Sequence, residues 1–96
     1  MSIERLDEST IASRLRELDN WKLVGDAIER SLSFDSFLDA ISFINRIADL
    51  AEEADHHPEI FNVYDTVKLT LTTHDAGGLT DKDFQLATQI DGEVHG

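Results

Sequence analysis

The spacing of apolar and polar positions divides the chain into helical and extended segments. Leucine and isoleucine recur at helical spacing over residues 7–18, which predicts a short amphipathic helix capped by Asp7 or Ser9. Alternating positions then flank a Gly-Asp turn, and this pattern predicts a β-hairpin built from residues 21–24 and 27–34. The first third of the chain is therefore expected to contain one helix and two strands.

The longest predicted element is a second helix, which begins after a cap at Asp35 or Ser36. Its apolar stripe, at a spacing of three and four residues, comprises Phe37, Ala40, Ile41, Ile44, Ala48 and Ala51. Because Pro58 disfavours the α conformation at the residue before it, we expect this helix to end at about Asp55 or His56.

The remainder of the chain predicts two more strands and a final helix. The strands are expected over residues 60–64 and 66–74, and the second of them alternates between apolar and polar residues. Its core face should carry Val67, Leu69 and Leu71, and its other face Lys68, Thr70, Thr72 and, if the alternation persists, His74. A glycine-containing turn follows, and the last helix, residues 80–90, begins with Thr80 and Asp83 at the spacing of a capping box.

The predicted order of elements is helix, two strands, helix, two strands, helix. Four strands with helices packed on one face form a two-layer α+β sandwich. No repeat, low-complexity tract or linker interrupts the chain, so we expect residues 1–96 to form a single domain.

Composition narrows the class of function. Eight basic and 20 acidic residues give a formal net charge of −12, and a surface of that charge repels nucleic acid. The chain has no cysteine, no apolar run long enough to cross a membrane, and no signal-like pattern in its first ten residues. We therefore expect a soluble cytoplasmic protein that binds neither nucleic acid nor membranes.

Candidate chemistry is concentrated in three histidines at the ends of predicted elements. His56 and His57 follow the long helix among several acidic residues. Glu52 lies four residues before His56, so on a helix its carboxylate can reach and orient that imidazole ring. His74 lies at the end of the fourth predicted strand. Because imidazole transfers protons readily near neutral pH, this pattern is typical of an acid-base site.

Each of these residues also has a simpler interpretation. A histidine at a helix end is often only a cap, and Asp83 is explained equally well by the capping box. Imidazole and carboxylate together suit zinc or iron, but neighbouring side chains diverge, so His56 and His57 are not expected to face one ion. We therefore expect no metal at this site, and His95 is expected to lie in an unstructured tail.

Over residues 18–92 the chain resembles the pterin-4a-carbinolamine dehydratases, also called 4a-hydroxytetrahydrobiopterin dehydratases. The segments that carry the resemblance include "HHPEIFNVY", "LTLTTHDAGGLT" and "LATQID". The family's pattern is an acid, His-His-Pro, an aromatic residue, a later histidine and an aspartate. It falls here on Glu52, His56, His57, Pro58, Tyr64, His74 and Asp83. One position departs, because Ile60 and Phe61 follow "HHPE" where the family usually has tryptophan, which puts substrate affinity in doubt.

The resemblance implies a hydro-lyase reaction. A tetrahydropterin that carries a hydroxyl at carbon 4a loses it as water, together with the proton on N5, and becomes a quinonoid dihydropterin. The implied catalytic residues are His57 and His74 as proton donor and acceptor in an order left open, with His56 and Glu52 positioning the ring and Asp83 supporting His74. The residues implied to bind substrate are His56, His57, Pro58, Thr73, His74, Asp75 and Ala76.

The resemblance also implies the fold and the partners. It predicts a four-stranded antiparallel sheet, no cofactor besides the pterin substrate, a functional link to an aromatic amino acid hydroxylase, and assembly as a homodimer or homotetramer. The main alternative is a non-catalytic dimerisation module that acts as a transcriptional cofactor. A role with another pterin, or in molybdopterin-related metabolism, also stays open.

Overall fold

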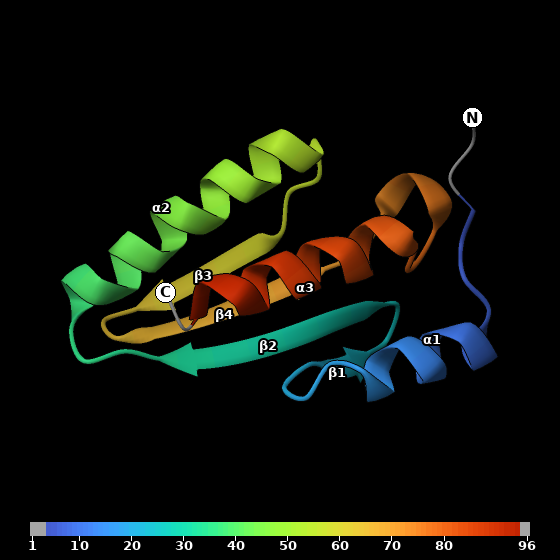
Figure 1. The fold of residues 1–96 in the computed structure, drawn as a ribbon, viewed down its shortest axis with the longest axis horizontal. Coiled ribbons are helices and arrows are strands. Elements are labelled where there is room, and N and C mark those ends of the chain that lie inside the picture. Colours follow the sequence, from blue (N-terminus) through green and yellow to red (C-terminus); the bar gives the residue numbers. More distant parts are fainter. Residues whose placement is uncertain (1–3, 95–96) are drawn as a thin grey trace.

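The computed structural model describes residues 4–94, and its elements follow the predicted order. They are α1 (Glu8–Arg16), β1 (Lys22–Val24), β2 (Ala27–Ser33), α2 (Phe37–Ala54), β3 (Glu59–Val63), β4 (Thr66–Leu71), the short 3₁₀ helix η1 (His74–Ala76) and α3 (Asp81–Val94). Figure 1 shows how these elements are arranged along the sheet. The prediction for His95 concerns a residue outside the described part of the chain.

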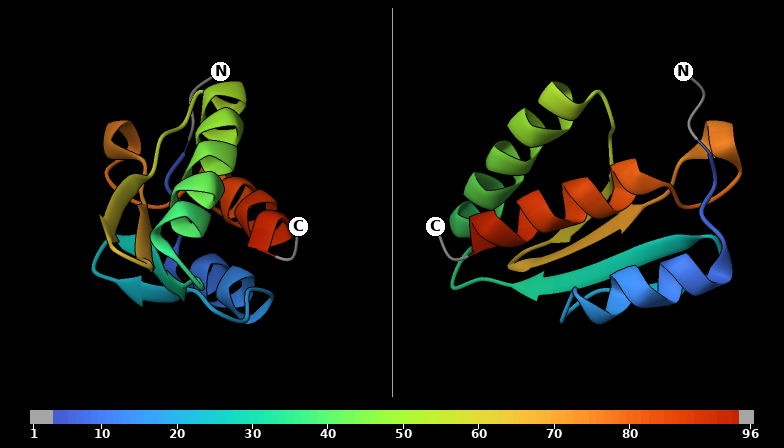
Figure 2. Two further views of the ribbon diagram at one scale, coloured as in Figure 1. Left: turned by 90° about the vertical axis from the view of Figure 1, so that its left-hand side faces the viewer. Right: turned by 45° about the vertical axis from the view of Figure 1, so that its right-hand side comes forward.

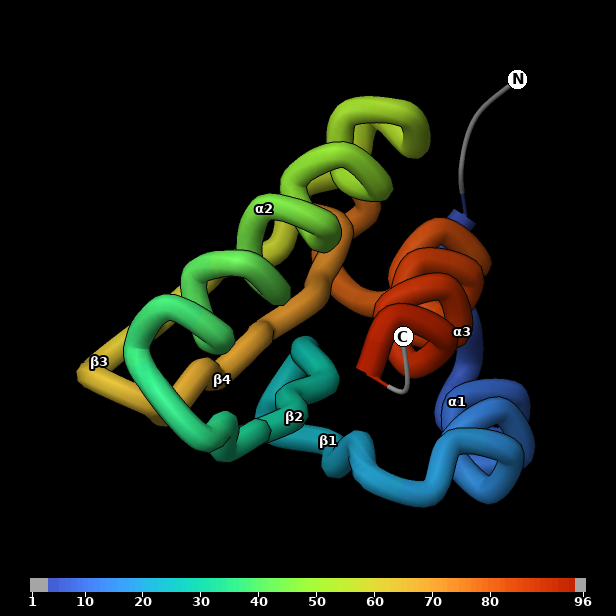
Figure 3. The backbone as a smooth tube through the Cα atoms, turned by 60° about the vertical axis from the view of Figure 1, so that its left-hand side comes forward, coloured from blue at the N-terminus to red at the C-terminus, as the bar shows by residue number. Residues whose placement is uncertain are grey.

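The four strands form one antiparallel sheet in the order β1-β2-β4-β3. The helices lie on one side of this sheet, as Figure 2 shows, and Figure 3 shows the same arrangement from another direction. Alternate residues of the central strands point towards the helices, and Ile28, Val67, Leu69 and Leu71 are all buried there. The predicted α+β sandwich is confirmed. Within residues 4–94, no helix is long and apolar enough to span a membrane.

Capping residues decide where the helices begin. The backbone N–H of Thr10 donates to Oδ1 of Asp7 at 2.8 Å, and this bond holds the pKa of the Asp7 carboxyl below its usual value. At α2, the hydroxyl oxygen of Ser36 accepts from the backbone N–H of Asp39 at 3.1 Å. Of the two caps predicted for each helix, Asp7 caps α1 and Ser36 caps α2.

The buried stripe of α2 differs from the predicted one. Its buried residues are Ala40, Phe43, Ile47 and Ala51, whereas Phe37 is 46% exposed and Ala48 is also exposed. The helix carries two overlapping rows of apolar residues, and both rows satisfy the spacing of three and four residues. Contact with the sheet and with α3 determines which row is buried, so the spacing alone selected Phe37 and Ala48 wrongly.

Strand β4 is three residues shorter than predicted. It ends at Leu71, and His74 begins η1 instead of closing the strand. The backbone of Thr73 pairs with Gly78 across a tight turn, in which Gly77 adopts a positive φ of 75°. The chain therefore leaves the sheet before His74.

A polar cluster that the alternation did not reveal lies between the sheet and α3. Arg30 is 8% exposed on the helix-facing side of β2, where it forms an ion pair with Asp91 of α3. The indole N–H of Trp21 donates to the same carboxylate at 2.9 Å. Trp21 therefore joins the β1 region to α3.

Replacing Asp91 by alanine is expected to lower the free energy of unfolding by about 3 kcal/mol, because Arg30 would stay buried without its carboxylate. The matched control is Asp81→Ala in the first turn of the same helix, whose more exposed ion pair with Arg14 should contribute less than about 1 kcal/mol. Urea denaturation measures both losses. Equal losses in the two variants would contradict the importance of the buried pair.

Candidate active site

The end of α2 brings His56 onto a fully buried aspartate. Nε2 of His56 lies 2.6 Å from Oδ1 of Asp83, and the imidazole is almost completely buried. Asp55 adopts a left-handed backbone conformation directly after α2, and the backbone N–H of His56 donates to the carbonyl oxygen of Ala51 at 3.1 Å. This C-terminal cap turns the chain so that His56 points inwards to α3.

Asp83 is held by two threonines as well as by His56. Its Oδ2 accepts from the Thr73 hydroxyl at 2.7 Å and from the backbone N–H of Thr80 at 2.9 Å. The bond from Thr80 confirms the capping-box half that was predicted for Asp83. The carboxylate therefore has a hydrogen-bonding partner at both oxygens, which compensates for its complete burial.

His57 occupies a different environment, although it is the next residue. Its side chain is 58% exposed, and Nε2 lies 2.7 Å from Oε1 of Glu52. The prediction that Glu52 orients His56 is therefore wrong. Because α2 ends at Ala54, the left-handed residue that follows carries the ring of His57, and not that of His56, over Glu52.

The third histidine lies on the turn between β4 and α3. His74 is exposed, and it directly follows Thr73, whose side chain contacts Asp83. Figures 1 and 2 show this turn and the C-terminal end of α2 on the upper side of the molecule, with the turn farther to the right in Figure 1. The prediction that Asp83 supports His74 is wrong. The imidazole that contacts Asp83 is that of His56.

The other residues predicted to bind substrate border the same region. Pro58 is half-buried between the histidine pair and β3. Asp75 and Ala76 belong to η1, and the backbone N–H of Ala76 donates to the carbonyl oxygen of Thr73 at 3.1 Å. The turn thus offers an exposed carboxylate and a polar backbone beside His74.

The two adjacent histidines diverge, as expected, since each contacts a different carboxylate. Among residues 4–94, no three histidine, aspartate or glutamate side chains are placed to hold one metal ion. The arrangement consists of one buried imidazole-carboxylate pair beside two exposed imidazoles. Chemically, it provides groups that accept and donate protons.

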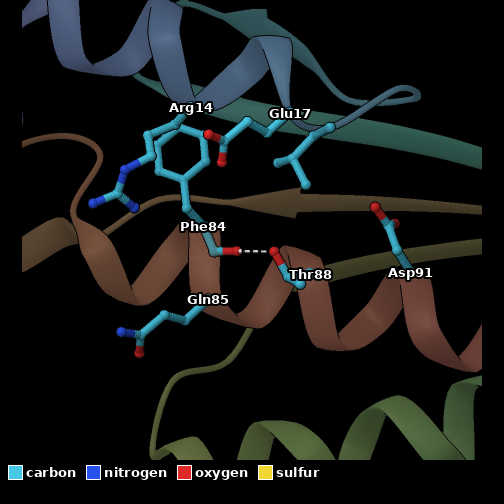
Figure 4. Close-up of a pocket in the computed structure, with 7 residues that line it drawn as sticks. Arg14, Glu17, Phe84, Gln85, Thr88 and Asp91 are labelled. Atoms are coloured by element: carbon cyan, nitrogen blue, oxygen red, sulfur yellow. Dashed lines mark hydrogen bonds between the residues drawn. The ribbon is translucent and has the colours of Figure 1, made fainter.

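A surface hollow of about 410 Å³ lies away from these histidines, between α1 and α3. Its lining residues are Arg14, Glu17, Leu18, Phe84, Gln85, Thr88 and Asp91, most of which Figure 4 labels. Two of its charged side chains already have partners, because Arg14 contacts Asp81 and Asp91 contacts Arg30. We therefore place the candidate site at the histidines and not in this hollow.

Sequence reasoning missed the side chain of Thr73 and its contact with the hydroxyl of Thr80. Both are buried, and their hydroxyl oxygens lie 2.9 Å apart. A signal for the first was present, because the alternation of Val67, Leu69 and Leu71 places residue 73 on the core face. A buried threonine hydroxyl next to a histidine needs a hydrogen-bonding partner, so this position predicts a polar contact.

A family model and several relatives match nearly the whole chain. A family model described as Pterin 4 alpha carbinolamine dehydratase matches residues 4–93. A relative from Thermomicrobium roseum, named "Putative pterin-4-alpha-carbinolamine dehydratase", is 51% identical over 90% of this chain and 92% of its own length. A relative of the same name from Halobacterium salinarum is 47% identical over 92% of this chain and 94% of its own length.

Solved structures share the fold. A crystal structure from Brucella melitensis, described as a transcriptional coactivator/pterin dehydratase, has a TM-score of 0.90 and 41% sequence identity, and the match covers 94% of this chain and 98% of that one. A pterin dehydratase-like protein described as a RuBisCO assembly factor has a TM-score of 0.67 over 79% of this chain and 90% of its own. At 23% identity, the second match shows the fold alone.

Proposed function

Because this chain belongs to the pterin-4a-carbinolamine dehydratase family, we propose that it dehydrates a 4a-hydroxytetrahydropterin to the quinonoid dihydropterin. In this reaction the bond between carbon 4a and its hydroxyl oxygen breaks, and the proton on N5 leaves. The electron pair of the N5–H bond forms the C4a=N5 double bond, and the products are the dihydropterin and water. No electrons are gained or lost overall, so the reaction needs no redox partner.

The chemistry requires two proton transfers. Hydroxide is a poor leaving group, so an acid must protonate the departing oxygen while a base accepts the N5 proton. In our proposal, His57 and His74 perform these transfers, because both imidazoles are exposed to an incoming ligand. His56 lies behind them on Asp83 and orients the site from within the fold.

One observation carries the proposal more than any other: a buried His56–Asp83 pair lies next in sequence to an exposed histidine and is linked through Thr73 to a second one. A helix cap would not need a fully buried carboxylate aimed at the ring. The pterin would lie against the exposed turn, with backbone groups of Thr73, Asp75 and Ala76 in contact and Pro58 at the border. The departure at Ile60 and Phe61 leaves Phe61 exposed on β3.

The decisive experiment follows the 4a-hydroxy intermediate. An aromatic amino acid hydroxylase, the proposed source of the substrate, generates the intermediate, and its loss is recorded with and without this protein. Acceleration over the spontaneous dehydration, unchanged after exhaustive chelation, supports metal-free acid-base catalysis. Loss of acceleration after chelation would instead support the metal alternative.

The alternative function is a non-catalytic interaction module. The description of the Brucella melitensis structure as a coactivator as well as a dehydratase favours keeping this candidate. The hydroxylase assay separates the two functions, because an interaction module would leave the spontaneous rate unchanged.

We also propose that a second copy of the chain covers the edge of the sheet. Within residues 4–94, strand β3 pairs only with β4. The exposed apolar residues along it and its turn are Ile60, Phe61, Val63 and Tyr64. Sedimentation velocity should therefore detect a dimer or tetramer. A monomer at every concentration would contradict this assembly.

A further inference from the structure

The hydroxyl of Thr73 occupies a central position in the candidate site, because it connects the segment that carries His74 to the carboxylate that holds His56. We propose that Thr73 is a positioning residue, whose hydroxyl acts through Asp83 to keep His56 in the tautomer protonated at Nε2. This inference rests on the proposed dehydratase function for its kinetic consequences. Its effect on the imidazole can be measured without any substrate.

The hydrogen bonds around Thr73 have only one consistent direction. The Thr73 side chain is buried, with 8% of the residue exposed, and its Oγ1 lies 2.7 Å from Oδ2 of Asp83. A hydroxyl has one hydrogen, and an ionised carboxylate only accepts, so Thr73 donates to Asp83. The Thr80 hydroxyl, 2.9 Å away, must then donate to Thr73.

A hydrogen bond at the Thr80 hydroxyl supports this direction. The backbone N–H of Lys82 donates to Oγ1 of Thr80 at 3.2 Å, which leaves the Thr80 hydrogen available for Thr73. The sequence of donors therefore runs from the first turn of α3 through two hydroxyls to the carboxylate. Each of the two hydroxyls donates one hydrogen bond and accepts one.

The consequence for His56 follows from the occupancy of the two carboxylate oxygens. Oδ2 of Asp83 accepts from the Thr73 hydroxyl and from the backbone N–H of Thr80. Oδ1 faces Nε2 of His56 at 2.6 Å, and an ionised oxygen there requires a hydrogen on that nitrogen. In the neutral ring, Nδ1 is then the nitrogen with a free lone pair.

Thr73 also holds the turn that carries His74, but through its backbone. Its N–H donates to the carbonyl oxygen of Gly78 at 3.1 Å, and its own carbonyl oxygen accepts from Gly78 and Ala76. A change of the side chain alone leaves these bonds available. Removal of the hydroxyl should therefore loosen His56 without releasing the turn.

The test compares Thr73→Val, which removes the hydroxyl and keeps the branched shape, with Thr73→Ser, which keeps a hydroxyl. The control is Thr88→Val on the exposed side of α3, where the hydroxyl donates only to a carbonyl oxygen of its own helix. Each purified full-length variant is examined by ¹⁵N NMR of the imidazole nitrogens, by its pH–rate profile, and by kcat and KM in the hydroxylase-coupled assay.

In Thr73→Val, Oδ2 of Asp83 keeps only the backbone donor of Thr80, so the carboxylate is free to turn away from His56. We therefore expect this variant to give His56 a mixture of tautomers and to lower kcat about tenfold with little change in KM. Its pH–rate profile should also shift. Thr73→Ser, which keeps the donor, should recover the single Nε2–H tautomer and most of the kcat lost in Thr73→Val, and Thr88→Val should match the wild type in all three measurements. A Thr73→Val protein that keeps a single Nε2–H tautomer and the wild-type kcat would overturn the proposal. A Thr73→Val protein with a lower melting temperature but the wild-type tautomer and kinetics would also overturn it.

The NMR spectra remain informative if Thr73→Val does not fold or if the wild type is inactive. If Thr73→Val does not fold, the wild-type spectrum still decides, because His56 protonated at Nδ1 and not at Nε2 would overturn the proposal. If the wild type does not accelerate dehydration, the proposed function fails. The spectra of the folded variants then still show whether Thr73 sets the tautomer of His56.

Discussion

Replacing His57 by alanine is expected to lower turnover at least tenfold, within the roughly 10²–10⁴-fold contribution of general acid-base groups. The imidazole is 58% exposed, and within the described part of the chain its polar contact is with Glu52, so its removal should leave the fold intact. A fall in kcat at an unchanged melting temperature, measured in the hydroxylase-coupled assay, is the expected result. Added imidazole should restore part of the lost rate.

Glu52→Ala provides the matched comparison for His57. Exposed ion pairs contribute about 0–1 kcal/mol, so loss of this carboxylate should change the rate by at most about fivefold. Glu53→Ala, on the same helical turn, is the control for removal of a charge. A His57→Ala enzyme with wild-type turnover would remove His57 from the mechanism.

Replacing Asp83 by asparagine is expected to affect both activity and stability. The carboxylate is fully buried and accepts from Thr73, Thr80 and His56, whereas an amide offers only one accepting oxygen. We expect the free energy of unfolding to fall by about 2 kcal/mol, because a buried polar group loses its partner. Urea denaturation measures this loss.

The kinetic effect of Asp83→Asn follows from the same geometry. If the amide oxygen stays with Thr73 and Thr80, its NH₂ group faces Nε2 of His56, and the ring must move its proton to Nδ1. An incorrect tautomer is expected to lower turnover by about 10²–10⁴-fold. Asp81→Asn, an exposed position two residues earlier, is the control and should retain full turnover. Wild-type turnover in Asp83→Asn would show that the ring's tautomer does not matter.

The contrast between His56 and His57 explains how adjacent identical residues take different roles. One imidazole is buried against Asp83, and the other is exposed beside Glu52. The left-handed residue Asp55 and the restriction imposed by Pro58 bring about this divergence over a very short segment. The two histidines of this segment therefore lie in two distinct environments.

The sequence by itself determined which elements form and where most of them end. Capping residues such as Asp7 and Ser36, the Gly-Asp turn, and Pro58 act over a few residues, so their effects can be read from local order. The alternation along β4 likewise identified its buried face. The three histidines at element ends, together with the family resemblance, were enough to locate the candidate site.

Only the tertiary structure decided which partner each polar group received. Asp83 meets His56 although 27 positions separate them, Arg30 meets Asp91 across the core, and the Thr73 hydroxyl meets Asp83 of the last helix. The choice between the two apolar rows of α2 was also made by packing against the sheet. Periodicity describes which face of an element is apolar, whereas pairing depends on the relative position of elements that are distant in sequence.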